Sequence, residues 1–384
     1  MDSNALVGII GSGAMGAGIA QVAAEAGHAV RVYDNNPAAL ERADAAMRRL
    51  FGRLVARGKR TPEVADAVLA RIRYVSSLYE LTGCALVVEA IVEDLGVKRG
   101  VFEELGALLP AGSILATNTS SLSVTAIAAS AKTPERVLGL HFFNPAPLMR
   151  LVEVVPAVQT APGVVEECRA LMTAWGKDAV LARDTPGFIV NRVARPYYSE
   201  ALRIYDEGLA TPAEIDAAME RVGFRMGPFH LMDFIGHDVN FRVTESMYRS
   251  HWEEPRYRPS FSQKALVDAG YLGRKTGRGF YRYGADGKPE REAVTLGEEA
   301  LAEVSDRVLA VLITEAYDAL RFGVASADDI DRAMRRGVNY PRGLIAWGEE
   351  LGRGVVAARM EGLWGRYREG RYRGGGGLLG EGWE

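Results

Sequence analysis

The chain has 384 residues, which is more than one ordinary hydrophobic core accommodates, so two or three domains are expected. Apolar residues make up 48% and charged residues 25%, a composition typical of soluble globular proteins. The formal net charge of −3 provides no overall basic field, which argues against a nucleic-acid-binding protein.

The spacing of the cysteines and the length of the apolar runs indicate the cellular compartment of the protein. Cys84 and Cys168 lie in different segments without metal-ligand spacing, so we interpret them as reduced thiols of a cytoplasmic protein without a metal site. Residues 1–4 lead directly into an apolar strand, without the basic and apolar regions of a signal peptide. No apolar run approaches the roughly 18 residues of a membrane span, so no membrane contact is expected.

The first half of the chain alternates strand-like and helix-like patterns. Strands are predicted over residues 5–10, 29–33, 85–90, 113–117 and 137–142, and helices over 14–26 and 37–59. This alternation predicts a Rossmann-like α/β domain, with a mostly parallel sheet covered by helices on both faces. The run 151–155 follows 137–142 too closely for a helical crossover, so it is predicted to return antiparallel.

The pattern becomes helical near residue 184. Asp184-Thr185-Pro186 is a helix-start signal, since proline in a first turn loses only an N–H that has no helical partner. The dinucleotide-type domain is therefore predicted to span 1–186, followed by an all-α region.

The helical region contains an internal repeat with an offset of 115 residues and no gap. The offset places Asn191 on Asp306, Glu200 on Glu315 and Ile215 on Ile330. We expect two helical modules, 187–288 and 296–373, joined through a glycine-rich polar stretch at 281–289. The tail 374–384 begins with a run of glycines and is predicted to be disordered.

A glycine motif follows the first predicted strand. Gly11, Gly13 and Gly16 fit G-x-G-x-x-G at the point where a strand turns into a helix, the context of dinucleotide-binding loops. Free N–H groups at the helix start attract phosphate. Asp34 ends the second strand, where a carboxylate accepts hydrogen bonds from ribose hydroxyls and repels a 2′-phosphate, so NAD is favoured over NADP. The alternative is a glycine-rich turn without a ligand.

Two titratable residues lie inside apolar strands. His141 is in the predicted strand 137–142 and Glu153 is in the returning run 151–155. A buried carboxylate needs a partner, and an antiparallel return through 144–147 brings the two residues toward each other. Glu153 would then hold one imidazole nitrogen and leave the other to accept a proton. The alternative is a structural ion pair.

Further polar residues lie where ligands bind in such folds. Ser120 belongs to the polar run 117–121 after the strand 113–117, at the carboxyl end of a parallel sheet. The alternative for this run is a helix cap. Asn191 is expected one and a half turns into the helix that starts at Asp184, from which its side chain would reach a ligand; the alternative is an exposed helical asparagine.

Together these segments resemble the 3-hydroxyacyl-CoA dehydrogenase family. The matching motifs are residues 11–16 with Asp34, 88–93 (VEAIVE), 118–122 (NTSSL), 141–145 (HFFNP), 151–154 (LVEV), 184–192 (DTPGFIVNR) and 272–281 (LGRKTGRGFY). The resemblance covers about residues 1–283 in order, and it is specific because independent motifs keep their spacing.

The resemblance implies a function and roles for individual residues. It implies NAD-dependent oxidation of 3-hydroxyacyl-CoA, as in fatty acid β-oxidation, butanoate metabolism or phenylacetate breakdown. His141 would be the catalytic base and Glu153 its partner, while Ser120 and Asn191 would bind and orient the substrate oxygen. The residues implied to contact the cofactor or line its pocket are Glu93, Lys98, Asn118, Asn144 and Lys275.

One part of the family pattern is absent. The positions that offer a serine and a lysine to coenzyme A hold Leu50 and Arg57 here. Arg57 retains a cation for a phosphate, whereas Leu50 cannot donate a hydrogen bond. The basic stretch from Arg48 to Arg60 is either a phosphate-binding patch or a solvated helix face.

The second helical copy has Asp306 in place of Asn191, and it repeats neither the glycine motif nor the His–Glu pair, so we interpret it as structural. Family members with one copy pair these domains between subunits. The tethered copy therefore predicts a monomer with an internal pseudo-dimer, or a weak homo-oligomer.

Three alternative functions share parts of this pattern. A gulonate dehydrogenase of the lambda-crystallin type has the same constellation, but Phe142, Phe143 and Met149 favour the acyl-CoA branch. A 6-phosphogluconate-type enzyme would carry a lysine where this chain has Asn191 and Arg192. A non-catalytic NAD-binding sensor is disfavoured by the intact constellation. The acyl chain stays open between 3-hydroxyadipyl and a short straight chain such as 3-hydroxybutyryl.

Overall fold

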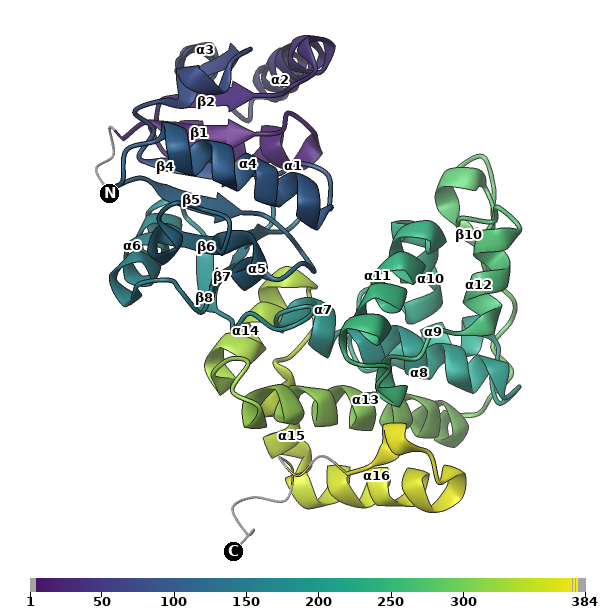
Figure 1. Cartoon of the computed structure of the whole chain (residues 1–384). Coiled ribbons are helices and arrows are strands. Elements are labelled where there is room, and N and C mark those ends of the chain that lie inside the picture. Colours follow the sequence, from purple (N-terminus) through teal and green to yellow (C-terminus); the bar gives the residue numbers. More distant parts are fainter. Residues whose placement is uncertain (1–4, 375, 377, 379–384) are drawn as a thin grey trace, which may run out of the picture. The chain divides into compact units, whose positions relative to one another are not determined.

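The computed structural model describes residues 5–374, 376 and 378, and these form two compact units that meet in the chain between Phe188 and Ile189 (Figure 1). Most of the tail predicted to be disordered, residues 375, 377 and 379–384, lies outside the described residues. In the part of the chain that the structure describes, no helix is long and apolar enough to cross a lipid bilayer.

The N-terminal unit contains one eight-stranded sheet with the strand order β3-β2-β1-β4-β5-β6-β7-β8. The strands are β1 Val7–Ile10, β2 Val30–Tyr33, β3 Ile72–Val75, β4 Leu86–Glu89, β5 Ile114–Thr117, β6 Val137–Phe142, β7 Leu151–Pro156 and β8 Asp178–Leu181. Of these neighbours only β6 and β7 pair antiparallel. The predicted parallel sheet and its antiparallel return are therefore confirmed.

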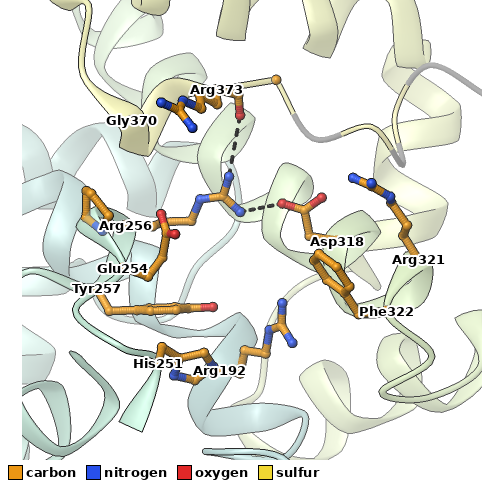
Figure 2. A pocket seen from close by; sticks show the side chains of 12 residues that line it. Arg192, His251, Glu254, Arg256, Tyr257, Asp318, Arg321, Phe322, Gly370 and Arg373 are labelled. Atoms are coloured by element: carbon orange, nitrogen blue, oxygen red, sulfur yellow. Dashed lines mark hydrogen bonds and ion pairs between the residues drawn. The ribbon is translucent and has the colours of Figure 1, made fainter. Parts of the chain in front are cut away.

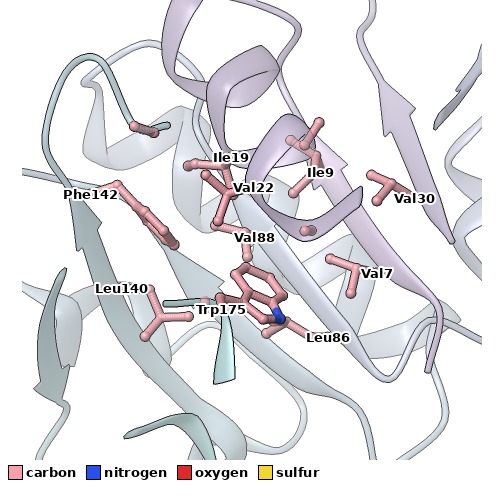
Figure 3. Close-up of a cluster of buried hydrophobic side chains, with 14 of the residues drawn as sticks. Val7, Ile9, Ile19, Val22, Val30, Leu86, Val88, Leu140, Phe142 and Trp175 are labelled. Atoms are coloured by element: carbon pink, nitrogen blue, oxygen red, sulfur yellow. The ribbon is translucent and has the colours of Figure 1, made fainter. Parts of the chain in front are cut away.

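Helices cover both faces of this sheet, and every residue of β1, β4, β5 and β6 is therefore buried. The helices are α1 Ala14–Glu25, α2 Pro37–Ala56, α3 Pro62–Arg71, α4 Leu95–Leu108, α5 Val124–Ala128 and α6 Pro162–Ala174, with short 3₁₀ turns at Leu78–Leu81 and Pro134–Arg136. The core on one face joins Ile19 and Val22 of α1 to Ile9, Val88 and other alternate strand residues (Figure 3).

Three local features of this unit were not predicted correctly. The edge strands β3 and β8 were missed, because an edge strand is covered less completely and carries polar residues such as Arg73 and Asp178. Asp184 does not begin a helix. Its carboxylate accepts hydrogen bonds from the backbone N–H groups of Val124 (3.1 Å) and Thr125 (2.7 Å), and it therefore caps α5.

The C-terminal unit is helical. Its first part contains α7 Val190–Val193, α8 Arg195–Asp206, α9 Pro212–Arg221, α10 Pro228–Ile235, α11 His237–Ser250, α12 Phe261–Asp268, 3₁₀ turns η3 Pro255–Tyr257 and η4 Arg274–Thr276, and the hairpin strands β9 Arg282–Tyr283 and β10 Pro289–Glu290. Its second part contains α13 Glu298–Arg321, α14 Ala327–Gly337, α15 Leu344–Leu351, α16 Arg353–Tyr367 and the turn η5 Gly370–Tyr372.

The two parts share local structure near the predicted offset, with the aspartates 115 residues apart and the residues that they cap 116 apart. The Asp216 carboxylate accepts the backbone N–H groups of Phe229 (2.8 Å) and His230 (2.9 Å) at the start of α10. The Asp331 carboxylate accepts those of Ile345 (2.7 Å) and Ala346 (2.9 Å) at the start of α15. The same residue type thus performs the same capping in both copies.

The copies differ where one long helix, α13, replaces the two helices α7 and α8. Pro196 stands in the first turn of α8, and a proline has no N–H to donate to a continuous helix. The corresponding residue of the second copy is Val311, inside α13. The break corrects the expected position of Asn191, which lies in the short α7 rather than in a helix that starts at Asp184.

Candidate active site

The glycine loop between β1 and α1 is shaped by close backbone contacts. Gly11 has φ +96°, and a Cβ on it would lie 2.5 Å from the carbonyl oxygen of Ala90. A Cβ on Gly16 would lie 1.8 Å from the carbonyl oxygen of Gly11, so only glycine lets α1 pack here. Gly13 caps α1 and has no heavy atom within 4 Å of its Cβ position, so the helix start opens onto free space that fits a pyrophosphate.

Asp34, at the end of β2, lies beside this loop. One carboxylate oxygen, Oδ2, accepts hydrogen bonds from the backbone N–H (2.8 Å) and hydroxyl (2.7 Å) of Ser12, and Oδ1 accepts the N–H of Asn36 at 3.0 Å. Burial raises the pKa of Asp34, but these hydrogen bonds lower it by more, so the net pKa is below its ordinary value. An ionised carboxylate next to the glycine loop fits the ribose hydroxyls of NAD and opposes a 2′-phosphate.

His141 and Glu153 are directly opposite each other in the antiparallel pair of β6 and β7. Nδ1 of His141 lies 2.6 Å from Oε2 of Glu153, whose side chain is fully buried. A carboxylate accepts, so Nδ1 carries the proton of this hydrogen bond and Nε2 has a free lone pair when the ring is neutral. Phe143 and Phe188 flank the imidazole, with ring centroids 4.5 and 5.8 Å away.

The polar loop after β5 is held in place beside β6. Oδ1 of Asn118 accepts the backbone N–H of Phe142 at 2.8 Å, which ties the loop to the residue that follows His141. Glu93 accepts the hydroxyl of Thr119 at 2.6 Å and the backbone N–H of Ser120 at 2.9 Å. The structure therefore gathers these expected site residues at the carboxyl ends of adjacent strands.

A buried network supports Glu93, and it includes one residue without a role in the sequence analysis. Nζ of Lys98 lies 2.6 Å from Oε1 of Glu89 and 3.3 Å from Oε2 of Glu93, and the Lys98 side chain is 1% exposed. Glu89 also accepts the hydroxyl of Thr117 at 2.7 Å. Glu89 was missed, although it lies inside the predicted apolar strand 85–90, and a carboxylate inside an apolar strand is the signal that had identified Glu153.

This network keeps Glu93 charged. Burial raises its pKa, but the hydrogen bonds from Thr119 and Ser120 and the Lys98 ammonium lower it more, so the net pKa is below its ordinary value. Glu93 is therefore a fixed acceptor that orients the Ser120 segment.

Three other positions of this unit lie outside that network. Arg57 is exposed and caps the C-terminal end of α2. Leu50 packs against the hydrophobic core, which explains in physical terms why this position does not offer a hydrogen bond. Asn144 is exposed in the turn after β6, next to a cis peptide bond with Pro145.

Two expected site residues belong to the C-terminal unit. Asn191 is in α7, where its carbonyl oxygen accepts Nε of Arg195 at 3.3 Å. Lys275 is in η4, and its Nζ lies 2.5 Å from Oδ1 of Asp238 in the first turn of α11.

Comparison with known families gives two adjoining matches. The model for the NAD binding domain of 3-hydroxyacyl-CoA dehydrogenase matches residues 6–185. The model for the C-terminal domain of the same family matches residues 187–283 and again 304–375, which are the two helical parts.

Individual relatives agree with these matches. The chain is 42% identical to 3-hydroxyadipyl-CoA dehydrogenase of Escherichia coli K12, over 96% of this chain and 95% of the relative. It is 40% identical to 3-hydroxybutyryl-CoA dehydrogenase of Bradyrhizobium diazoefficiens, over 74% of this chain and 98% of the relative.

A solved structure covers nearly the whole chain. The crystal structure of 3-hydroxybutyryl-CoA dehydrogenase from Escherichia coli K12 superimposes with a TM-score of 0.92 at 39% identity, over 99% of this chain and 98% of that one. With both family models matched in order and a relative aligned along almost all of its length, this chain belongs to the 3-hydroxyacyl-CoA dehydrogenase family.

Proposed function

We propose that this protein oxidises the 3-hydroxyl of an (S)-3-hydroxyacyl-CoA to the 3-oxo group, with NAD as the electron acceptor. The observation that carries the proposal is the pair of His141 and Glu153 in the same unit as the glycine loop and Asp34. A base for the hydroxyl proton and a cofactor site are the two requirements of this reaction.

The residues of the pair act together on the proton. Nε2 of His141 accepts the proton of the substrate hydroxyl, and Glu153 stabilises the imidazolium that forms because it faces Nδ1 at 2.6 Å. The burial of Glu153 strengthens this interaction, since little water competes for the carboxylate. The glycine loop and Asp34 would hold NAD, which would supply the acceptor for the hydride from C3 of the substrate.

Two polar residues position the reacting oxygen in this proposal. The hydroxyl of Ser120 binds the oxygen, and its backbone is already fixed by Glu93. Asn191 of α7 donates from its amide to the same oxygen. Glu93, Lys98, Asn118, Asn144 and Lys275 contact the cofactor or support the residues that do, and Arg57 meets a phosphate of coenzyme A.

The acyl group is proposed to be short, because the relatives named above act on 3-hydroxyadipyl-CoA and 3-hydroxybutyryl-CoA. The test is the rate of NADH formation with 3-hydroxybutyryl-CoA, 3-hydroxyhexanoyl-CoA, 3-hydroxyadipyl-CoA and L-gulonate. A higher kcat/KM for any of the CoA esters than for L-gulonate supports the proposal. Faster oxidation of L-gulonate, or no NADH formation with any of the four, contradicts it.

We also propose that the two helical modules, 187–288 and 296–373, form a pseudo-twofold pair inside one chain, in a cytoplasmic protein. Two reciprocal ion pairs support this arrangement. Nε of Arg192 lies 2.7 Å from Oε1 of Glu315, and Nε of Arg307, at the equivalent position, lies 2.6 Å from Oε1 of Glu200.

The tyrosines of the two turns repeat this reciprocity. The hydroxyl of Tyr257 donates to Glu315 at 2.6 Å, and that of Tyr372 donates to Glu200 at 2.7 Å. Only the first copy is proposed to serve the reaction, because Asp306 replaces Asn191 and is held by Arg359 at 2.6 Å.

A further inference from the structure

The two copies differ in what contacts the terminal nitrogens of one arginine, which is Arg192 in the first copy and Arg307 in the second. Nε of Arg307, in the second copy, donates to Glu200. The two terminal nitrogens of Arg307 form a bidentate pair with Glu207, with Nη1–Oε2 at 2.9 Å and Nη2–Oε1 at 3.1 Å. This planar arrangement is the geometry in which guanidinium and carboxylate bind most strongly. Arg307 is thus enclosed by carboxylates on both of its edges.

Arg192, the equivalent arginine of the first copy, has no second carboxylate of this kind among the described residues. Glu207 follows α8 directly, and the residue at the same place after α13 is Phe322. Nε of Arg192 meets Glu315 as expected, but no described carboxylate meets its terminal nitrogens, and the Phe322 ring lies 5.6 Å from its guanidinium carbon.

A cavity lies at this place, beside Arg192 of the first copy and Phe322 of the second. Its volume is about 720 Å³, and Arg192, Tyr257 and Phe322 contribute to its lining (Figure 2). The hollow lined by the equivalent residues, among them Arg203 and Glu207 of the first copy and Arg371 of the second, measures about 260 Å³. A space of the larger size accommodates a small metabolite.

The cavity has unpaired positive charge. Arg321 and Arg373 contribute to its lining. Their guanidinium groups lie over the rings of Phe322 and Trp364, at 5.3 and 6.0 Å from the ring centroids, and neither forms an ion pair with a described residue. The lining holds four arginines, Arg192, Arg256, Arg321 and Arg373, against two carboxylates, Glu254 and Asp318, and Asp318 is engaged by Arg256 at 2.5 Å. Such a cavity attracts anions.

We propose that this cavity in the helical unit binds a small organic dicarboxylate. One carboxylate of the ligand takes, beside Arg192, the place that the Glu207 carboxylate has beside Arg307, and it forms a bidentate pair with the terminal nitrogens of Arg192. The second carboxylate is held by Arg321 and Arg373. The site is built from the C-terminal unit alone and is independent of the proposed reaction.

The test measures binding of glutarate to the full-length protein by calorimetry at constant ionic strength. Glutarate carries the same carboxylate as a glutamate side chain, and glutaramide is its neutral counterpart. Saturable binding of glutarate without binding of glutaramide is the expected result. Inorganic phosphate, which lacks the planar carboxylate, is expected to bind more weakly.

Two variants locate the binding. Phe322 is the second-copy equivalent of Glu207, so Phe322→Glu places a carboxylate beside Arg192 as Glu207 is placed beside Arg307. The variant carboxylate is expected to occupy Arg192 and lower glutarate affinity by about tenfold or more. Phe234→Glu is the matched control, because Phe234 is 53% exposed and Phe322 is 54% exposed. Arg321→Gln removes a cation without adding a carboxylate and is expected to weaken binding as well.

The proposal is overturned if glutarate does not bind saturably, if glutaramide binds equally well, or if phosphate binds more tightly than glutarate. It is also overturned if Phe322→Glu and Arg321→Gln bind glutarate as tightly as Phe234→Glu does. Failure of these tests leaves the proposed dehydrogenase reaction unaffected, since NADH formation is measured separately.

Discussion

Nδ1 of His141 lies 2.6 Å from Oε2 of Glu153, across two antiparallel strands that keep both residues buried. The pairing orients the imidazole, because the carboxylate accepts only from a protonated nitrogen and so assigns the proton to Nδ1. The opposite nitrogen is then available to a substrate.

Replacing the base is expected to remove proton transfer while leaving cofactor binding intact. His141→Ala should lower kcat by about 10²–10⁴-fold, the usual contribution of a general base, with NADH affinity changed little. His28→Gln is the control, since His28 is also buried but its partners, the carbonyl oxygen of Ala5 at 2.9 Å and the Trp175 ring at 5.6 Å, have no proposed role in the reaction. A His141→Ala enzyme with near wild-type turnover would show that another group removes the proton.

Changing the partner of the base is expected to slow the chemistry with less effect on binding. Glu153→Gln keeps the shape of the side chain, but it removes the negative charge that stabilises the imidazolium. We expect kcat to fall by about tenfold or more and KM to change little. Single-turnover measurements check this, and an unchanged rate of hydride transfer would make the pair purely structural.

The ionised Asp34 predicts a preference for NAD. The wild-type protein is expected to show a higher kcat/KM with NAD than with NADP, and Asp34→Asn is expected to reduce that ratio by about tenfold, because the variant no longer repels a 2′-phosphate. Steady-state rates with both cofactors test this. Equal use of NAD and NADP by the wild type would contradict the assignment of Asp34.

Glu214 is expected to make stability depend on pH in acid. Its carboxylate accepts the backbone N–H of Thr211 (2.9 Å) and the hydroxyl of Thr295 (2.7 Å), and these bonds hold its pKa at about 2, below the ordinary 4.5. A lowered pKa gives stability that is present above pH 4.5 and lost as pH falls toward 2. Glu214→Gln should therefore destabilise the fold by about 1 kcal/mol at neutral pH, and the difference should shrink in this acid range.

Urea unfolding at several pH values measures this difference. Glu292→Gln, at an exposed position, is the control and should show no such dependence. A deficit of Glu214→Gln that is constant from pH 7 to pH 3 would contradict the role of the charge.

The internal pairing of the helical modules predicts the effect of truncation. Deleting everything after Gly287 leaves Arg192 without Glu315 and exposes the apolar face that α13 buries. The shortened protein is expected to dimerise or aggregate, whereas the tethered copies of the full chain pair within one molecule. Light scattering on both proteins is the measurement. A soluble truncated monomer would show that the second module does not substitute for a partner subunit.

The sequence alone determined the features that depend on short-range patterns. The glycine loop, the alternation of strands and helices and the 115-residue repeat are visible because they follow the periods of strands and helices and the register of a duplication. The closeness of His141 and Glu153 was also predictable, because polar residues in two consecutive apolar strands must find partners.

Tertiary structure decided the features that depend on which distant segments meet. The edge strands β3 and β8 have weak patterns and are defined by pairing with β2 and β7. Asp184 caps α5, 60 residues away in the chain, rather than a helix of its own. The difference between Glu207 and Phe322 matters only in the folded chain. Glu207 of the first copy contacts Arg307 of the second, whereas Phe322 of the second copy lies beside Arg192 of the first. Nε of each arginine is held by a glutamate of the other copy. Local propensity contains no information about such contacts, so only the folded chain reveals them.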